Sequence, residues 1–91
     1  MRLDVFLKLS RLIHRRSLAQ EFCDAGAVSV NGAIAKSSKM VAAGDEIAIT
    51  KPDRIETFRI LDLPKSKQVS KTSASELYEL IERKEQKGLD L

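Results

Sequence analysis

The first apolar residues of the chain recur at the spacing of one helix face. Phe6 and Leu7 follow Leu3 at three and four residues. This period is typical of an amphipathic helix, and it predicts a short helix over residues 3–10. Asp4 falls in the first turn of that helix, where the helix dipole favours a negative charge.

A second helix is predicted from Ser17. Its first four residues, Ser-Leu-Ala-Gln, have the form of a capping box, in which side chains satisfy the free backbone N–H groups of a helix start. Gly26 is expected to end this helix, because glycine readily takes the left-handed conformation that follows helix ends. The residues expected to face inward are Leu18, Phe22 and Ala25.

After Gly26 the period changes from that of a helix to that of a strand. Val28 and Val30 are the apolar positions of an alternating run that leads into Asn31-Gly32, a strong signal for a tight hairpin. Later turns are expected at Gly44-Asp45 and Pro52-Asp53, and further strands over residues 33–35, 46–49 and 55–62. The pattern therefore predicts a small, mostly antiparallel sheet and an α+β fold.

The last part of the chain is expected to contain a linker and a helix. Residues 64–75 show neither period and are rich in Ser and Lys, so they are predicted to form a flexible connection. Ser73-Ala74-Ser75-Glu76 has the form of a second capping box, and the pattern that follows predicts a helix over residues 76–88. One domain is accordingly expected over residues 1–63.

Composition limits the chemistry that the chain can carry. Cys23 and His14 are the only residues of their kinds, so neither an internal disulfide nor a Cys/His zinc site can be assembled. No catalytic set and no glycine-rich phosphate loop are recognisable, and neither an enzyme nor a bound cofactor is expected. No apolar run reaches the roughly 18 residues of a membrane span, and Asp4 interrupts any signal peptide, so a cytoplasmic protein is expected.

Positive charge is concentrated in the N-terminal half. The net charge is +3, but residues 1–44 contain seven Lys and Arg against three Asp and Glu, whereas residues 45–63 contain three against five. An uneven field of this kind is typical of a surface that binds a polyanion. A solvated surface without a ligand would account for so small an imbalance equally well on charge alone.

The spacing of the basic residues favours one shared surface. If the first helix continues past Ser10, then Lys8, Arg11 and Arg15 follow one face of it. Arg16 lies directly before the second helix, whose first N–H groups favour phosphate. The two helices would then share one positive edge.

Residues beyond the helices extend this predicted surface. Lys36 and Lys39 follow the hairpin, and they extend the basic surface if the sheet packs beside the helices. His14 is expected to be a loop residue that flanks this surface. The phenylalanines fall on apolar faces, so contacts to phosphates and to the shape of folded RNA are expected in place of base stacking.

Several motifs together resemble the RNA-binding domain named after ribosomal protein S4. They follow one another at the spacing of that family over about the first fifty residues: Arg2-Leu3-Asp4-x-Phe6-Leu7, Arg16-Ser17-Leu18-Ala19, Gly26-x-Val28-x-Val30-Asn31-Gly32, Lys36, Ser38, Val41 and Gly44-Asp45-x-Ile47. The resemblance implies an alpha-L fold, in which two helices pack on a short sheet. It also implies that the helical face and the hairpin bind structured RNA.

The start Met-Arg-Leu-Asp, the length and the motif Ser10-Arg11-Leu12-Ile13-x-Arg15-Arg16 closely resemble the RqcP family of bacterial ribosome-associated quality-control factors. This resemblance implies binding to large ribosomal subunits that carry an obstructed peptidyl-tRNA, with contacts to ribosomal RNA and to the tRNA near the P-site. It further implies that the partner RqcH acts on the same particle in adding C-terminal alanines.

Among the basic residues, the resemblance ranks Arg2 and Arg16 first for RNA contacts. The full set of predicted RNA-binding residues is Arg2, Lys8, Arg11, Arg15, Arg16, Lys36 and Lys39. Because Arg16 is predicted to be exposed, Arg16→Ala is expected to weaken subunit binding and to leave thermal stability nearly unchanged.

Two alternatives remain open at the level of sequence. One is a heat-shock protein of the same domain type, which also acts on large subunits with stalled tRNA. The other is an adaptor that docks a protein on the C-terminal helix, through Leu77, Tyr78 and Ile81. Deleting residues 64–91 separates RNA binding from the adaptor role, because RNA binding by the N-terminal domain is expected to survive that cut largely intact. A monomer without a small-molecule substrate or membrane contact is expected.

Overall fold

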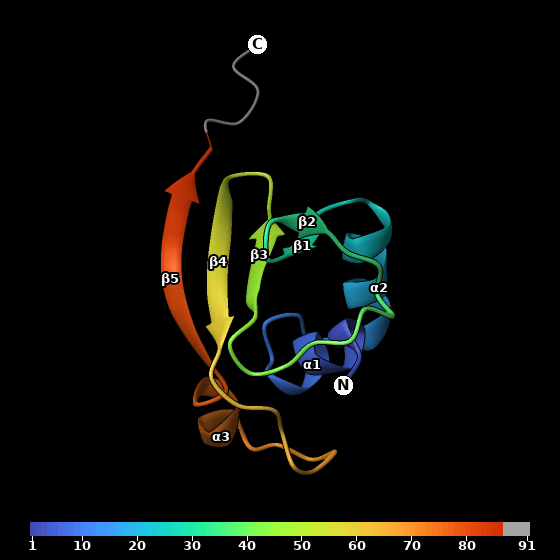
Figure 1. Ribbon diagram of the computed structural model, residues 1–91, viewed down its shortest axis with the longest axis vertical. Coiled ribbons are helices and arrows are strands. Elements are labelled where there is room, and N and C mark those ends of the chain that lie inside the picture. Colours follow the sequence, from blue (N-terminus) through green and yellow to red (C-terminus); the bar gives the residue numbers. More distant parts are fainter. Residues whose placement is uncertain (87–91) are drawn as a thin grey trace.

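The computed structural model of the protein describes residues 1–86. Its helices are α1 (Leu3–Leu9), α2 (Arg16–Asp24) and α3 (Lys71–Ser75). Its strands are β1 (Val28–Val30), β2 (Ala33–Ile34), β3 (Glu46–Thr50), β4 (Arg54–Ile60) and β5 (Tyr78–Glu85). Figure 1 shows α1 and α2 beside β1, β2 and β3, whereas β4 and β5 lie on the far side from them with α3 below. The helices of the described part are too short and too polar to span a bilayer.

The strands of the described residues form one antiparallel sheet in the order β2-β1-β3-β4-β5. The hairpin predicted at Asn31-Gly32 joins β1 to β2, and the φ angles of its two residues, 51° and 87°, are the positive values that such a turn requires. Gly26, with a φ of 74°, follows the end of α2 as predicted. Two helices packed on this sheet confirm the predicted α+β fold class.

The core lies between the two N-terminal helices and the sheet. Leu3, Phe6 and Leu7 are all fully buried, so the predicted apolar face of α1 is confirmed. Ile47 and Ile49 of β3 belong to the same cluster of buried side chains. The alternation of buried and partly exposed residues along β3 matches a sheet that faces helices on one side only.

The start of α2 differs from the prediction. Arg15 is the last extended residue, with φ −128° and ψ 140°, so the helix begins at Arg16, and Ser17 lies inside its first turn. The capping box predicted at Ser17 is therefore wrong. Arg16 and Gln20, one helical turn apart, both donate to the carboxylate of Asp4, and this long-range contact requires Arg16 on the same helix face as Gln20.

The buried face of α2 also differs in part. Ala19 and Cys23 are buried and Phe22 is half-buried against the core, which places the inward residues at intervals of three and four. Leu18 lies one position before this face and is 38% exposed, and Ala25 follows the end of the helix and is exposed. Of the three residues expected to face inward, only Phe22 packs against the core.

The largest correction concerns the C-terminal segment. Residues 78–85 form β5, so the helix predicted over residues 76–88 is wrong for the described part, and residues 87 and 88 lie outside it. β5 pairs along its length with β4, with Tyr78 opposite Ile60 and Leu80 opposite Phe58. The free edge of β4 offers backbone hydrogen bonds to a whole strand, and this tertiary pairing outweighs a local helical pattern.

The segment before β5 differs as well. Ser70 caps α3 by accepting a hydrogen bond from the backbone N–H of Ser73 at 3.1 Å, so the capping box predicted to begin at Ser73 is wrong. Leu77 is buried and Tyr78 is half-buried, with its ring edge-on to Phe58 at a centroid distance of 5.3 Å. The predicted adaptor face on a C-terminal helix is therefore not formed.

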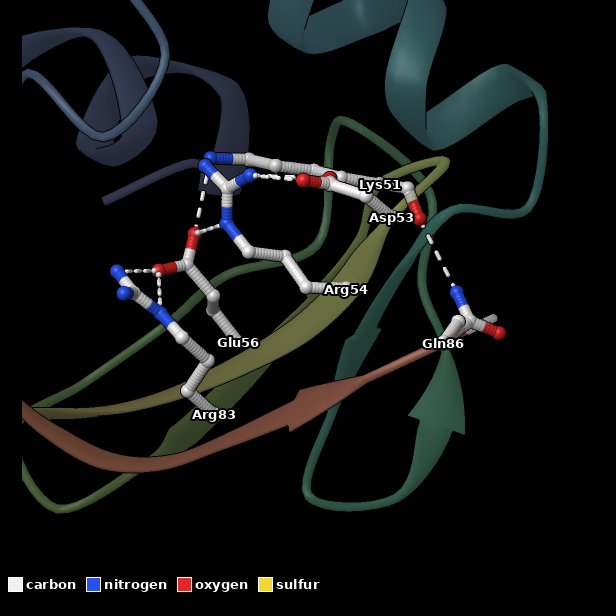
Figure 2. A network of polar contacts seen from close by, with 6 residues as sticks. All are labelled: Lys51, Asp53, Arg54, Glu56, Arg83 and Gln86. Atoms are coloured by element: carbon white, nitrogen blue, oxygen red, sulfur yellow. Dashed lines mark hydrogen bonds and ion pairs between the residues drawn. The ribbon is translucent and has the colours of Figure 1, made fainter. Parts of the chain in front are cut away.

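A buried carboxylate fixes β5 to β4. Glu56 is 5% exposed and accepts hydrogen bonds from Arg83 at 2.7 and 3.1 Å and from Nζ of Lys51 at 2.9 Å (Figure 2). Nε of Arg54 lies 3.3 Å from the same carboxylate, while its Nη1 donates to Asp53. A carboxylate removed from water is costly unless cations compensate it, so these contacts fix the position of β5 as well as the charge of Glu56.

Candidate functional site

A second buried carboxylate lies in the first turn of α1. Asp4 is 0% exposed, and its oxygens accept hydrogen bonds from three side chains. Arg2 donates from Nε and Nη2 at 3.1 and 3.2 Å, Arg16 from Nε at 3.1 Å, and Gln20 from Nε2 at 2.9 Å. Asp4 thus connects the residue before α1 with the first two turns of α2.

These contacts keep Asp4 ionised. Burial alone would raise the pKa of its carboxyl group, but the hydrogen bonds from Gln20, Arg2 and Arg16 and the positive charge of Arg16 outweigh burial. The pKa is lowered from 3.8 to about 2. At neutral pH the site therefore contains one negative charge and two positive charges, with a positive excess on the outer side.

The two arginines are fixed at one end and accessible at the other. The side chains of Arg2 and Arg16 are 42% and 49% exposed. Arg16 uses only Nε toward Asp4, and within residues 1–86 its two terminal nitrogens make no hydrogen bond. The planar guanidinium group matches two oxygens of a phosphate, so a guanidinium already held in place is suited to bind one.

The loop before β3 brings two lysines to the same end of the molecule. The backbone N–H of Leu3 donates to the carbonyl of Lys39 at 2.7 Å, and that of Asp4 donates to the carbonyl of Ser37 at 3.1 Å. Lys36 and Lys39 both have exposed side chains. The loop after the hairpin therefore packs beside α1, and the part that its lysines play in RNA binding stays a prediction.

Lys8, Arg11 and Arg15 do not form the predicted stripe on one helix. The structure ends α1 at Leu9, and Arg11 has a left-handed backbone conformation with a φ of 63°. Arg15 precedes α2 in extended backbone. Lys8 and Arg11 line a depression together with His14, which therefore lies beside the basic residues as expected.

The sequence pattern assigned Asp4 only a favourable interaction with the helix dipole, whereas the structure shows that it holds two arginines. One signal could have revealed this. Asp4 lies beside Leu7 at the margin of the apolar face of the helix, and a buried acidic residue requires partners. Gln20 carries no comparable signal, because its role depends on how α2 packs against α1.

Known proteins match this chain in sequence over most of its length. The S4 domain family matches residues 1–47, a span that contains Arg2, Asp4, Arg16 and Gln20. The RQC P-site tRNA stabilizing factor of Halalkalibacterium halodurans is 46% identical over 80 residues, which cover 88% of this chain and 89% of that protein. The factor of the same name from Bacillus subtilis is 41% identical over 81 residues, with 89% and 92% covered.

Solved structures are similar in fold. The trimeric structure of Heat Shock Protein 15 from Vibrio cholerae has a TM-score of 0.79 at 32% identity, covering 89% of this chain and 81% of that one. The solution structure of a hypothetical protein has a TM-score of 0.78 at 39% identity, with 90% and 98% covered. Both matches extend beyond residue 47, so the likeness includes much of the sheet that follows the matched S4 domain.

Proposed function

The chain belongs to the S4 domain family, among the RQC P-site tRNA stabilizing factors, and from this premise we propose that it is a non-enzymatic protein that binds ribosomal RNA and tRNA in ribosome quality control. One observation carries the proposal for the binding surface. The buried carboxylate of Asp4 holds Arg2 and Arg16 so that part of each guanidinium group stays accessible.

Preorganisation is the physical argument for this surface. An arginine that is already immobilised loses less conformational entropy on binding a phosphate than a free one does. Lys36 and Lys39, together with Arg15, add exposed positive charge around the two arginines. Contacts of this kind recognise phosphates and the shape of folded RNA, and they need no exposed aromatic rings.

The particle that we propose for this protein is the large ribosomal subunit. The relatives' names contain the words P-site tRNA stabilizing, which supports binding to a large subunit that carries an obstructed peptidyl-tRNA. There the protein acts in the cytoplasm as a monomeric clamp, together with RqcH during the addition of C-terminal alanines. It performs no bond chemistry, and its binding energy shifts the tRNA population toward one position.

Salt dependence tests the binding surface. If about four to six phosphates are neutralised, the logarithm of the association constant should fall against the logarithm of the salt concentration with a slope of about −3 to −5. The measurement is sedimentation of the purified protein with isolated large subunits, with and without peptidyl-tRNA, over a salt series. Affinity that stays constant across the series would contradict the proposal.

The kind of ribosomal particle that binds the protein tests the proposed role on large subunits with obstructed peptidyl-tRNA. The expected result is recovery of the protein with large subunits that retain peptidyl-tRNA, whereas recovery with small subunits or free tRNA alone would overturn it. Loss of alanine tailing in cells that lack the protein, with tailing restored by the wild type, would support the role beside RqcH.

A second candidate is a recycling factor of the heat-shock type. The observation in its favour is the TM-score of 0.79 with Heat Shock Protein 15. Such a factor would bind the same particle but would not be needed for alanine tailing. The tailing assay therefore separates the two candidates, which the subunit-binding assay does not.

A further inference from the structure

Two neighbouring depressions share Arg11 and His14 as lining residues. One lies between the end of α1 and the chain before α3, and the other lies between the same end of α1 and α3 itself. No Asp or Glu of the described residues lines either of them. We call them together the Arg11 groove, and the cationic side chains that line it are Lys8, Arg11, Lys67 and Lys71.

The segment before α3 has a defined place beside α1. Nη2 of Arg11 donates a hydrogen bond to the backbone carbonyl of Val69 at 3.1 Å, and Val69 itself packs against the core. Lys67 and Lys71 lie two residues to either side of this contact. Residues that the sequence assigned to a flexible connection thereby contribute cations to the same groove as Lys8 and Arg11.

The backbone of Arg11 supports a role for its side chain. Arg11 follows the cap of α1 with a φ of 63°, a conformation that glycine adopts freely and that a residue with a side chain adopts only with strain. A glycine would therefore end this helix more easily than an arginine does. The guanidinium group at this position holds Val69 and also supplies a charge to the groove.

The charges of the groove lack compensation. Within residues 1–86, none of its four cations forms an ion pair. The cluster around Glu56 differs, because there the cations surround a buried carboxylate of the protein itself (Figure 2). Like charges gathered without a counter-charge repel one another and raise the local positive potential, which attracts a polyanion.

From these observations we infer that the Arg11 groove binds the phosphate backbone of RNA, as a contact separate from the Arg2 and Arg16 surface, and that Lys67 and Lys71 are RNA-binding residues. The inference rests on the proposed function, which supplies RNA as the polyanion. It assigns the segment between β4 and β5 a binding role in addition to its structural one.

A matched pair of double variants of the full chain tests the inference. Lys67→Gln with Lys71→Gln removes two charges from the groove. Lys65→Gln with Lys84→Gln removes two exposed charges that do not line the groove. Lys65 lines an adjoining depression, where Asp62 and Glu76 supply negative charge, and Lys84 lies on β5. The probes are a short labelled oligouridine and isolated large subunits, each titrated over a salt series, with thermal unfolding to confirm that both variants fold.

The expected result is a change in salt slope for the groove variant alone. Each phosphate contact contributes about 0.7 to 0.9 to the slope, so losing two should reduce its magnitude by about 1.4 to 1.8. An unchanged slope in the groove variant, while the wild type still binds large subunits, would overturn the inference and leave the proposed function standing. No binding of the wild type to either probe would overturn both.

Chemical footprinting gives an independent readout. Reagents that acylate exposed lysines should modify Lys67 and Lys71 less when RNA is bound, while Lys65 and Lys84 keep their reactivity. Equal reactivity of all four lysines with and without bound subunits would contradict the inference, even if the slope changed.

Discussion

Arg16 donates a hydrogen bond from Nε to Oδ2 of Asp4 over 3.1 Å, and this contact joins the first turn of α2 to the first turn of α1. The arginine side chain is 49% exposed, whereas the carboxylate side chain is fully buried. The inner end of Arg16 therefore stabilises the fold, while its outer end remains available to a phosphate. A substitution at Arg16 should consequently affect both stability and binding.

Arg16→Ala is expected to lower the free energy of unfolding as well as the affinity for large subunits. Within residues 1–86, the substitution leaves the buried Asp4 with only Arg2 and Gln20 as side-chain partners. A hydrogen bond to a charged group contributes about 1.5–3 kcal/mol, and partial exposure of the arginine reduces this, so a loss of about 1–2 kcal/mol is expected. Urea unfolding measures it. This revises the sequence-based expectation of nearly unchanged stability.

Arg15→Ala is the matched control for that variant. Arg15 is exposed, and within residues 1–86 it forms no ion pair. Its loss should weaken subunit binding modestly and leave the unfolding midpoint unchanged. If both variants unfolded at the wild-type midpoint, the Asp4 contact would contribute nothing to stability.

Asp4→Asn tests whether the carboxylate positions the arginines. The amide keeps the size of the side chain but removes the negative charge, so Arg2 and Arg16 lose their ionic partner and gain conformational freedom. Affinity for large subunits should fall even though the protein surface becomes more positive, which a purely electrostatic surface would not show. Binding at constant salt measures this, and a rise in affinity would contradict preorganisation.

Acid should unfold the protein through Asp4 and Glu56, the buried carboxylates of residues 1–86. Burial would raise the pKa of Glu56, but the hydrogen bonds from Lys51 and Arg83 and the charges of Lys51 and Arg54 lower it from 4.5 to about 2, and Asp4 is lowered to about 2 as well. A lowered pKa means that the stabilisation is present above the ordinary pKa and is lost as the pH falls through the folded value.

The free energy of unfolding should therefore decrease between about pH 5 and pH 2. Glu56→Gln and Asp4→Asn should each make this decrease shallower, because one of the two titrating groups is gone. Urea unfolding over a pH series measures the slope. Variants with the wild-type slope would show that other carboxylates control acid unfolding.

The N-terminal part of this fold follows from the sequence because its signals are local. The spacing of Leu3, Phe6 and Leu7 and the turn at Asn31-Gly32 depend on neighbours a few residues away, and both predictions are confirmed. The start of α2 was predicted wrongly, since it depends on a contact between residues twelve apart, Asp4 and Arg16.

The C-terminal strand could not be predicted for the same physical reason. Its residues carry helix-favouring spacing, and only the free edge of β4 makes the extended conformation more stable. The Arg11 groove combines both cases, because Lys8 and Arg11 are visible as charges in the sequence, whereas the contact from Arg11 to Val69 spans 58 residues. The sequence identifies such cations as candidates, but only the tertiary structure shows which of them lie close together.

Leu7→Ala should destabilise the protein without altering the binding surface. Leu7 is fully buried in the cluster that joins α1 to the sheet, so the substitution leaves a cavity that costs about 2–5 kcal/mol. Leu80→Ala is the control, because Leu80 on β5 is 46% exposed and its loss should cost much less. Thermal unfolding compares the two, and subunit binding of the folded Leu7 variant should match the wild type below its melting transition.

Removal of residues 64–91 is expected to destabilise the remaining chain. The cut deletes β5 and the buried Ala74 and Leu77, and it takes Arg83 from the carboxylate of Glu56. Circular dichroism and urea unfolding of the fragment measure the loss, which should be larger than that of Arg83→Gln alone, since the single substitution keeps the strand pairing. A fragment as stable as the full chain would show that β5 adds nothing to the sheet. Binding of the truncated chain to large subunits is therefore measured only under conditions in which the fragment is shown to be folded. The folded fragment should keep binding through Arg2 and Arg16, which Asp4 holds in place, and should lose the contribution of Lys67 and Lys71.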